Sequence, residues 1–403
     1  MKSRNIVFYF PYNKGAGGVN ILFLKLANYF ADHTDCNIYI GDFTDGYMYL
    51  NNRNSKIQAL LISPNKKCEV PEDSVVIFQT ISPWYIEEEL QLKKGTRLLF
   101  WNLHPYNLLM YFKNYRRNVP AVYKIASPYV QHLIRKFAST AMEHHGLLFM
   151  DEENKKSAEM ILHRIIPQEN YLPVASDEAE RHHFDSGKNI VWVGRIADFK
   201  ISILLYIMRQ LSQYALKHNR ALQFHIIGDG PEAEQMHRSI PGCENEYFSV
   251  SLIGEIENAK IKEYLTERGN VLFAMGASAL EGARLGIPTI ILDFSYHPIG
   301  IDYRYRYLFE TKDYTLGKDI DGEGFTTGEH SMEEILDELH DPQRYQTVSD
   351  RCYQYYKNHH DIASVSKKLL DYIDRTELRY QHIEPYRNNI VMRLFKARKK
   401  LFK

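Results

Sequence analysis

Two cations stand where a predicted strand leads into a predicted helix, and their types suggest chemistry. Arg195 and Lys200 follow the short apolar run 189–193 and precede a helix expected from about residue 201 to 216. A guanidinium binds two phosphate oxygens at once, and an ammonium acts as a compact point charge, so the pair suits a diphosphate. The alternative interpretation is that both are solvated surface charges on a strand-to-helix turn.

An acid, Glu281, lies between two further apolar runs, at 271–274 and 287–292. A short helix is predicted from Ala279 onward, and the small residues before it, including Ser278, would let a ligand approach the free N–H groups of its first turn. Glu281 suits the ribose hydroxyls of a nucleotide. Alternatively, Ser278 and Glu281 form a capping box worth roughly 1 kcal/mol, which this segment alone favours.

The N-terminal residues 5–30 are predicted to form a strand, a Gly-rich turn and a helix. Gly17 and Gly18 stand in that turn, where a phosphate or a sugar would meet backbone N–H groups. The dinucleotide-binding pattern is incomplete because position 20 is Asn, although Asp42 follows the next strand. A tight turn without a ligand explains these residues equally well.

His104 follows the predicted strand 97–101, in the sequence Trp-Asn-Leu-His-Pro. The carboxyl ends of parallel strands face the crevice where open α/β sheets bind ligands. A histidine at this place is a candidate catalytic or orienting group. The alternative is an ordinary loop histidine.

Strands and helices alternate through both halves of the chain, which predicts an α/β protein with two doubly wound Rossmann-like domains. We expect domains at 1–180 and 186–360, a polar linker at 175–188, and a C-terminal part at 361–403. Loops containing Gly228, Gly254, Glu255 and Ile256 end two strands of the second half and would line one crevice. Further strands are predicted at 36–40, 74–78, 146–150, 170–174, 222–227 and 248–253, and further helices at 152–164, 258–267, 331–339, 341–358 and 361–382.

Composition excludes several classes of protein. The 403 residues suggest two domains, and 44% apolar with 25% charged residues is typical of a soluble globular protein. A net charge of zero argues against a dedicated nucleic-acid binder. The four cysteines have neither C-x-x-C nor zinc spacing, and no Asp-x-Asp pair lies on a loop plausible for a metal site, so free thiols and no metal are expected. Without a signal peptide or a membrane-length apolar run, the chain is expected to be cytoplasmic.

The C-terminal segment 389–403 carries six cations from Arg393 to Lys403 and no acid, and its apolar residues share a helical face. Such a basic amphipathic helix would lie on an anionic lipid surface, with about 1 kcal/mol from each cation. The chain would then be peripheral on the inner face of a membrane. The alternative is a soluble, frayed terminal helix.

Four segments of the second half, taken together, resemble the donor domain of glycosyltransferase family 4, which has the GT-B fold of two Rossmann-like domains facing each other across a cleft. They are VGRIADFK at 193–200, IIGDGPE at 226–232, SLIGEI at 251–256 and LEGARLGIP at 280–288. The turn at 15–18 and the His104-Pro105 loop resemble the first domain of that group. The resemblance is weakest at 40–95 and 294–330.

The resemblance implies a hexosyltransferase that moves a sugar from a nucleotide-diphosphate sugar to a glycan or lipid-linked acceptor, as in cell-envelope polysaccharide or lipopolysaccharide synthesis. It also implies that the reaction retains stereochemistry and that the enzyme needs no cofactor beyond the donor. Arg195 and Lys200 would hold the diphosphate and Glu281 the ribose. In addition, Gly228, Ser278 and Ala279 would line the donor site, the loop Gly254-Glu255-Ile256 would border the base, His104 would sit beside the transferred sugar, and Gly17 with Gly18 would admit donor or acceptor.

One position departs from the pattern of this group. The group usually carries two glutamates eight positions apart, but the earlier position here is Phe273, inside a predicted strand. The usual acidic contact to the sugar is therefore absent, which keeps a non-catalytic glycosyltransferase-like binding subunit as an alternative. A nucleotide-sugar epimerase or a dinucleotide-dependent oxidoreductase is a further alternative, and Asn20 together with the Arg195 and Lys200 pair counts against the oxidoreductase.

Overall fold

The computed structural model describes residues 4–11, 15, 17–63, 67–80, 84, 90–110, 120–167 and 170–387. The chain divides into two compact units. Unit 1 comprises Met1–Ala175 and Val365–Lys403, and unit 2 comprises Ser176–Ser364. The predicted basic helix at 389–403 lies outside the described residues. None of the described helices has the length and apolar composition needed to cross a membrane.

The sheet of unit 1 has six parallel strands in the order β3-β2-β1-β5-β7-β8, so the order reverses beside β1 as in a doubly wound fold. In β1, Ile6 is paired with Ile38 on one side and with Val75 on the other. Every residue of β5 is buried, as expected for a parallel strand covered on both faces. The strands are β1 (Asn5–Tyr9), β2 (Asn37–Phe43), β3 (Ile57–Ile62), β5 (Ser74–Gln79), β7 (Arg97–Asn102) and β8 (Leu147–Phe149), with a separate pair β4 (Cys68–Glu69) and β6 (Leu90–Gln91).

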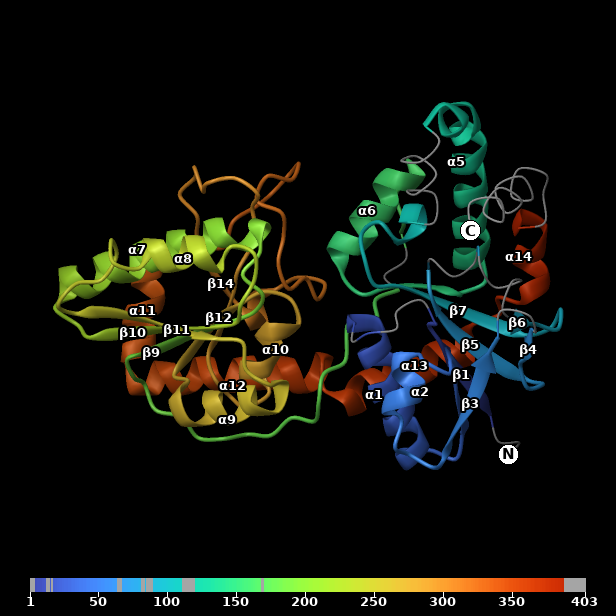
Figure 1. Cartoon of the computed structure of the whole chain (residues 1–403), viewed down its shortest axis with the longest axis horizontal. Coiled ribbons are helices and arrows are strands. Elements are labelled where there is room, and N and C mark those ends of the chain that lie inside the picture. The colour runs from blue at the N-terminus through green and yellow to red at the C-terminus, as the bar shows by residue number, and fades with distance from the viewer. Residues whose placement is uncertain are drawn as a thin grey trace. The chain divides into compact units, whose positions relative to one another are not determined.

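Helices cover the two faces of this sheet, with α1 and α2 on one side and α5 on the other (Figure 1). The predicted strand at 170–174 is wrong: the described part of that segment forms only an isolated bridge from Tyr171 to Phe149. The helices of unit 1 are α1 (Gly18–His33), α2 (Tyr47–Asn51), α5 (Pro120–Glu143), α6 (Glu152–Leu162), α13 (Ile362–Arg375) and α14 (Tyr380–Arg387).

The single helix predicted at 361–382 is wrong, because α13 ends at Arg375 and α14 begins at Tyr380. The residues between them bond to the start of β7 instead. The N–H of Leu98 donates to the carbonyl of Leu378 (2.8 Å), and the Thr376 hydroxyl donates to the carbonyl of Leu98 (2.8 Å). The backbone partners of a helix are thereby exchanged for partners at the start of β7.

Unit 2 repeats the architecture with the strand order β11-β10-β9-β12-β13-β14, in which only β14 is antiparallel to its neighbour. In Figure 1, α7 and α8 lie on one side of this sheet and α9 and α12 on the other. The strands are β9 (Asn189–Val193), β10 (Leu222–Ile227), β11 (Phe248–Gly254), β12 (Val271–Ala274), β13 (Thr289–Ile291) and β14 (Arg306–Tyr307). The helices are α7 (Asp198–His218), α8 (Ala233–Ser239), α9 (Asn258–Arg268), α10 (Ala277–Ala283), α11 (Met332–His340) and α12 (Pro342–His359), with a 3-10 turn at Leu308–Glu310.

The polar segment after Ala175 runs along unit 2 and is hydrogen-bonded to it. The N–H of Ser176 donates to His360 (2.8 Å), the N–H of Glu180 to Arg284 (2.9 Å), and the N–H of His182 to Leu285 (2.9 Å), in each case to the backbone carbonyl. This segment therefore reaches the end of α10 as part of unit 2.

The Tyr-rich segment 303–307 lies in the core of unit 2. Tyr303, Tyr305 and Tyr307 are each at most 1% exposed. Between them, Arg306 forms a buried ion pair with Asp293, and the Asp293 carboxylate also accepts from the backbone N–H of Lys318 (2.8 Å). These tyrosines are core residues that attach the edge strand β14.

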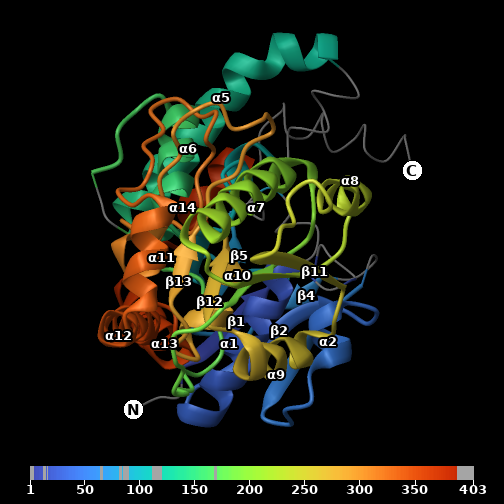
Figure 2. The same cartoon turned by 90° about the vertical axis from the view of Figure 1, so that its left-hand side faces the viewer.

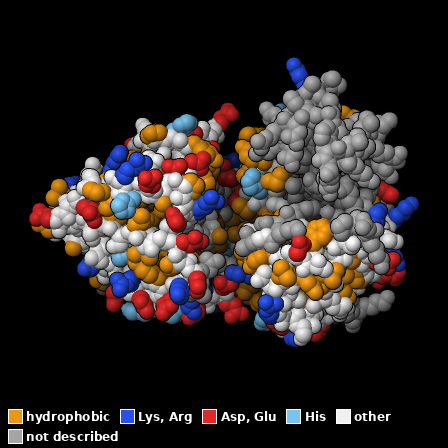
Figure 3. Space-filling view, in the orientation of Figure 1, with side chains coloured by type: hydrophobic (Ala, Val, Ile, Leu, Met, Phe, Trp, Pro, Cys, Tyr) orange, Lys and Arg blue, Asp and Glu red, His pale blue; other side chains and the backbone are white. Residues whose placement is uncertain are grey.

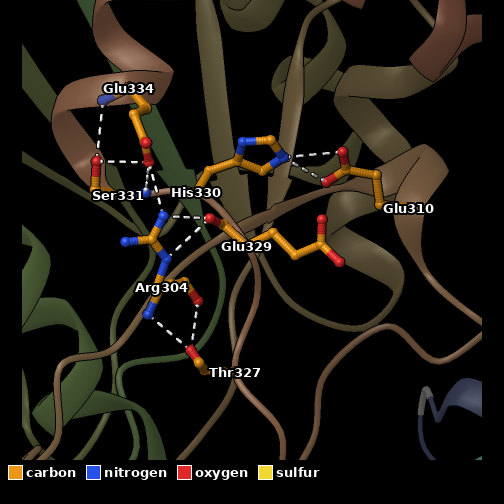
Figure 4. A network of polar contacts seen from close by, with 7 residues as sticks. All are labelled: Arg304, Glu310, Thr327, Glu329, His330, Ser331 and Glu334. Carbon is orange, nitrogen blue, oxygen red and sulfur yellow. Dashed lines mark hydrogen bonds and ion pairs between the residues drawn. The ribbon is translucent and has the colours of Figure 1, made fainter.

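A second polar network fixes the segment that follows β14 (Figure 4). The Arg304 guanidinium donates to the carbonyl of Glu329 and to the carboxylate of Glu334 (2.9 Å for the latter). His330 Nε2 contacts both carboxylate oxygens of Glu310, at 2.9 and 3.1 Å. The network holds the two ends of segment 311–329, whose Leu316 carbonyl accepts from the N–H of Gly276 (2.6 Å) at the start of α10.

Candidate functional site

A cavity of about 600 Å³ opens at the carboxyl ends of β9, β10 and β11 in unit 2. This is the edge at which open parallel sheets bind ligands. Three strand-ending loops and two helices line it. The lining residues are 193–195, 227–230, 255 and 256, with Ile261 of α9 and Ser278 of α10.

Backbone hydrogen bonds hold the three loops together. The N–H of Gly194 donates to Ile227 (3.0 Å), that of Ile196 to Asp229 (2.9 Å), and that of Gly228 to Gly254 (2.8 Å). Glycine is required at position 228, because its φ is 139° and a Cβ there would lie 1.8 Å from the Gly194 carbonyl oxygen. The floor of the cavity is therefore main chain, which a ligand can approach closely.

Arg195 is an exposed cation in the cavity wall. It makes no hydrogen bond or ion pair within the described part of the chain, so its guanidinium is available to an anionic ligand. The same wall carries two acids, Asp229 and Glu255. Asp229 accepts from the N–H of Gly230 (2.7 Å), which shapes its own loop.

The sequence predicted that Lys200 lies on the same turn as Arg195. This prediction is wrong, because α7 already begins at Asp198 and therefore includes Lys200. Its ammonium lies over two aromatic rings, 5.9 Å from the centroid of Trp192 and 5.5 Å from that of Phe199. Burial lowers the pKa of Lys200. A Cβ on Gly194 would meet the Lys200 nitrogen at 3.3 Å, so the cation borders the cavity wall without belonging to its lining.

The predicted capping box of α10 is wrong. The helix begins at Ala277 with Gly276 as its N-cap (φ 61°), and no side chain caps it. Ser278 therefore lies within the first helical turn and lines the cavity, whereas Ala279 is fully buried. Gly276 has no side chain, so it cannot cap the helix through a side-chain hydrogen bond.

Glu281 lies one helical turn after Ser278, on the same side of α10. Its Oε2 accepts from Nε of the buried Arg284 at 2.9 Å. The Glu281 side chain is 25% exposed, and its Oε1 has no hydrogen-bond partner among the described residues. Arg284 thus orients the carboxylate and leaves one oxygen able to accept from a ligand.

Phe273 lies inside β12, as predicted. It is fully buried and packs edge-on against the ring of Tyr305, with 5.8 Å between the centroids. The strand also pairs Phe273 with Trp192 of β9. The position that carries a glutamate in the resembled group is thus part of the hydrophobic core.

The N-terminal Gly-rich turn is closed by Asn20. The Asn20 side chain accepts from the N–H of Gly17 (2.8 Å) and donates to the carbonyl of Gly15 (2.7 Å). Gly17 is the N-cap of α1, and a Cβ on Gly18 would have no neighbour within 4 Å. Asn20, which departs from the dinucleotide-binding pattern, therefore stabilises the turn through these two hydrogen bonds.

His104 and Asp42 of unit 1 were also considered as functional residues from the sequence. His104 is exposed, and its Nδ1 accepts from the N–H of Tyr106 (3.2 Å). Asp42 lies within β2 and accepts from the N–H groups of Met48 (2.9 Å) and Tyr49 (3.2 Å), so it caps α2. Burial raises the pKa of Asp42. Its carboxylate therefore stabilises the start of α2, whereas the corresponding acid of a dinucleotide-binding fold binds the ribose.

Five of the predicted donor residues therefore line one cavity: Arg195, Gly228, Glu255, Ile256 and Ser278. Four others stand near them in the chain without lining the cavity: Lys200, Gly254, Ala279 and Glu281. The remaining three belong to unit 1: Gly17, Gly18 and His104. Ile261, which lines the cavity from α9, was not among the residues predicted from the sequence.

All four cysteines are free thiols. Within the ranges that the structure describes, no group of three or more His, Cys, Asp or Glu side chains is placed to hold a metal ion.

Comparison with known proteins places the fold. No family model matches the chain, and no curated protein sequence matches it. A glycosyltransferase structure from Rickettsia africae is similar over 94% of this chain and 100% of its own, with 11% identity and a TM-score of 0.54. The lipopolysaccharide outer core galactosyltransferase WaaB (14% identity, 92% and 99% coverage) and S. aureus TarM (12%, 87% and 58%) have TM-scores of 0.49 and 0.41. The chain spans 58% of the length of that TarM chain.

The similarity to the Rickettsia africae structure, together with the two doubly wound units, shows the class of the fold. The chain has the GT-B fold, as the sequence resemblance had predicted.

Proposed function

We propose that this protein is a glycosyltransferase that uses a nucleotide-diphosphate sugar as its donor. The observation that carries the proposal is the cavity of unit 2, where the cation Arg195 stands without a partner among the described residues at the edge that binds ligands in open α/β sheets. The proposed reaction breaks the bond between the sugar and the diphosphate and forms a bond from that sugar carbon to an acceptor hydroxyl. The other products are a nucleoside diphosphate and a proton.

The proposed diphosphate contacts come from Arg195 and Lys200. Negative charge grows on the diphosphate as the sugar leaves, and preorganised cations in a partly dry site stabilise that charge. Lys200 carries its charge over aromatic rings rather than against an acid, so a diphosphate would not compete with a carboxylate for it. The main-chain floor around Gly228 admits the phosphates closely.

The proposed ribose contact is Oε1 of Glu281. Arg284 holds the other oxygen and keeps the carboxylate oriented. Ser278 adds a hydroxyl in the cavity wall on the same side of α10, and the loop at Gly254, Glu255 and Ile256 would border the base. From unit 1, His104 would serve the transferred sugar, and Gly17 and Gly18 the donor or acceptor. Retention of stereochemistry and catalysis without a metal are part of the proposal.

The proposed acceptor is a glycan or a lipid-linked saccharide of the cell envelope. The proposed reaction is the transfer of a hexose to it, as in lipopolysaccharide synthesis. A basic amphipathic tail at 389–403 suits an enzyme that works at the cytoplasmic face of a membrane. Deletion of 389–403 should then lower co-sedimentation with anionic vesicles, and unchanged sedimentation would refute the role of the tail.

The second candidate function is a non-catalytic sugar-nucleotide-binding subunit. Phe273 favours it, because the buried ring supplies no acidic contact to the sugar. A nucleotide-sugar epimerase remains a weaker alternative.

Turnover separates these candidates. Purified protein should hydrolyse one nucleotide-diphosphate sugar slowly in the absence of acceptor, and Arg195→Ala should abolish that hydrolysis. His104→Ala should lower turnover while nucleotide binding persists, since His104 belongs to unit 1. Nucleotide binding without turnover of any donor sugar would instead establish the binding subunit.

A further inference from the structure

Glu255 is an acid in the wall of the proposed donor cavity. It is exposed, and it makes no hydrogen bond or ion pair within the described part of the chain. On the face of unit 2 seen in Figure 3, acids and cations are interspersed. The other acid of the cavity, Asp229, accepts from the N–H of Gly230 (2.7 Å). The Glu255 carboxylate would repel a diphosphate, so its presence in this site favours a ligand that also brings N–H or O–H donors to it.

The main chain holds Glu255 at the β11 end of the cavity. The carbonyl of Gly254 accepts from the N–H of Gly228 (2.8 Å), and Gly254 has a φ of 79°, which suits glycine. Neighbouring strands lie about 4.8 Å apart, so the order β11-β10-β9 puts about 10 Å between the strand ends that carry Glu255 and Arg195. This separation leaves room for a ribose between a group at Glu255 and a diphosphate at Arg195.

Apolar side chains line the cavity at this end. Ile256 follows Glu255 in the loop, and Ile261 belongs to α9, the helix that comes after the loop. Helices α9 and α8 lie on opposite faces of the sheet (Figures 1 and 2), so Ile261 approaches from one face. Both isoleucines are half-buried. An apolar surface beside one polar acceptor suits a flat base that is read by hydrogen bonds along its edge.

We propose that Glu255 selects guanine, so that the donor is a guanosine diphosphate sugar; this inference rests on the proposed function. A carboxylate has two acceptor oxygens and no donor. Guanine carries two adjacent donors on one edge, the N1–H and the 2-amino group, which match the two oxygens. Uracil and thymine place one N–H between two carbonyl oxygens, and adenine and cytosine place one amino group beside a ring acceptor. Each of these bases would turn a lone pair toward Glu255.

A ribose hydroxyl is the other donor that a nucleotide could bring to Glu255. The proposed ribose contact is Glu281 of α10, which follows β12. Because β10 and β9 lie between β11 and β12, the two acids approach the cavity from opposite ends. The two assignments also differ in outcome, since a ribose contact would serve every nucleotide equally and a guanine contact would serve only one.

The test is titration calorimetry of the full chain with the diphosphates of guanosine, inosine, uridine and adenosine. Wild-type protein should bind GDP roughly 10- to 100-fold more tightly than UDP or ADP, which is typical of one bidentate contact to a base. Inosine diphosphate lacks only the 2-amino group and should bind about tenfold more weakly than GDP.

The variant Glu255→Gln should bind GDP about tenfold more weakly or worse and should bind UDP with unchanged affinity. It should also gain affinity for xanthosine diphosphate, because the amide of Gln can donate to the C2 carbonyl of xanthine while its oxygen accepts from N1–H. A merely structural role of Glu255 would not produce this gain.

The matched control is Glu257→Gln, which removes a second exposed acid two residues away. Glu257 does not line the cavity, and its side chain does not cap α9, so all affinities should stay unchanged. Unchanged melting curves will establish that both variants are folded.

Tighter binding of UDP or ADP than of GDP would overturn the guanine assignment and leave the donor cavity in place. An unchanged preference for GDP in Glu255→Gln, or an equal loss for all nucleotides, would overturn the role of Glu255 in reading the base. Binding of no nucleoside diphosphate would overturn both this inference and the proposed function.

Discussion

Lys200 lies over the ring of Trp192, with 5.9 Å between its ammonium nitrogen and the ring centroid. Burial lowers the pKa of this lysine. A cation held by rings rather than by a carboxylate keeps its charge for a ligand, but only while it is protonated. This relationship makes diphosphate binding dependent on pH.

The first prediction concerns that pH dependence. Because the pKa of Lys200 is lowered, its charge should be lost at a pH below the ordinary lysine value of about 10.4. The affinity for a nucleoside diphosphate should therefore fall as the pH rises through that lowered pKa. Titration calorimetry at a series of alkaline pH values measures it. Lys200→Arg keeps its charge throughout and should flatten the profile, and the same profile in both proteins would contradict the assignment.

The second prediction concerns the cavity floor. Gly228→Ala should destabilise unit 2 by about 3 kcal/mol, because the added Cβ meets the Gly194 carbonyl oxygen and the backbone φ of 139° is strained for alanine. Urea unfolding measures the loss. In the control Gly242→Ala, the new Cβ would lie 3.7 Å from the carbonyl oxygen of Ser239, an ordinary contact, so little change is expected. Equal stability of the two variants would show that the loops do not pack as described.

The third prediction concerns Phe273. Phe273→Glu should destabilise the fold by several kcal/mol, because it buries a carboxylate without a partner against Tyr305. Phe273→Leu should be folded, should lose roughly 1–3 kcal/mol, and should still bind nucleotide. Thermal melting with and without nucleotide compares the two variants. A stable Phe273→Glu protein would mean that this position reaches the cavity.

The fourth prediction concerns Asp151, the N-cap of α6. Burial raises its pKa to about 6, well above the ordinary aspartic acid value of about 3.9. The folded state therefore binds the proton more tightly than the unfolded chain, so this group should make the protein less stable as the pH rises between about 4 and 6. The loss is on the order of 3 kcal/mol.

Asp151→Asn keeps an acceptor for the N–H of Asn154 and removes the titration. Urea unfolding between pH 4 and 7 should show a smaller decline in the variant than in the wild type. Parallel curves for the two proteins would refute the raised pKa.

Much of the fold follows from the sequence. Short apolar runs predicted β9 and β12, whose residues are almost all buried, because parallel strands covered on both faces need such runs. Helix α5 was not predicted, and Pro128 within it interrupts the usual helical signal. The short strand β3 was also missed, since half of its residues are exposed.

Local geometry was harder to predict than residue identity. The start of α10 was misplaced because Gly276 caps it with a positive φ, which an S-x-x-E pattern does not reveal. The pairing of Arg284 with Glu281 lies within one helical turn and could have been predicted from spacing. The contact of the Lys200 ammonium with the Trp192 ring could not have been predicted from spacing, because it depends on how helix α7 packs against strand β9.

The most direct test of the proposed donor site is a thermal shift assay of the purified protein with UDP, GDP, ADP, CMP, dTDP and NAD, beside Arg195→Ala and Glu281→Ala. A ligand at about 100 times its dissociation constant adds about 2.7 kcal/mol of stability. One nucleoside diphosphate should stabilise the wild type, and both variants should lose that shift. No shift with any nucleoside diphosphate, or a shift with NAD alone, would contradict the glycosyltransferase proposal.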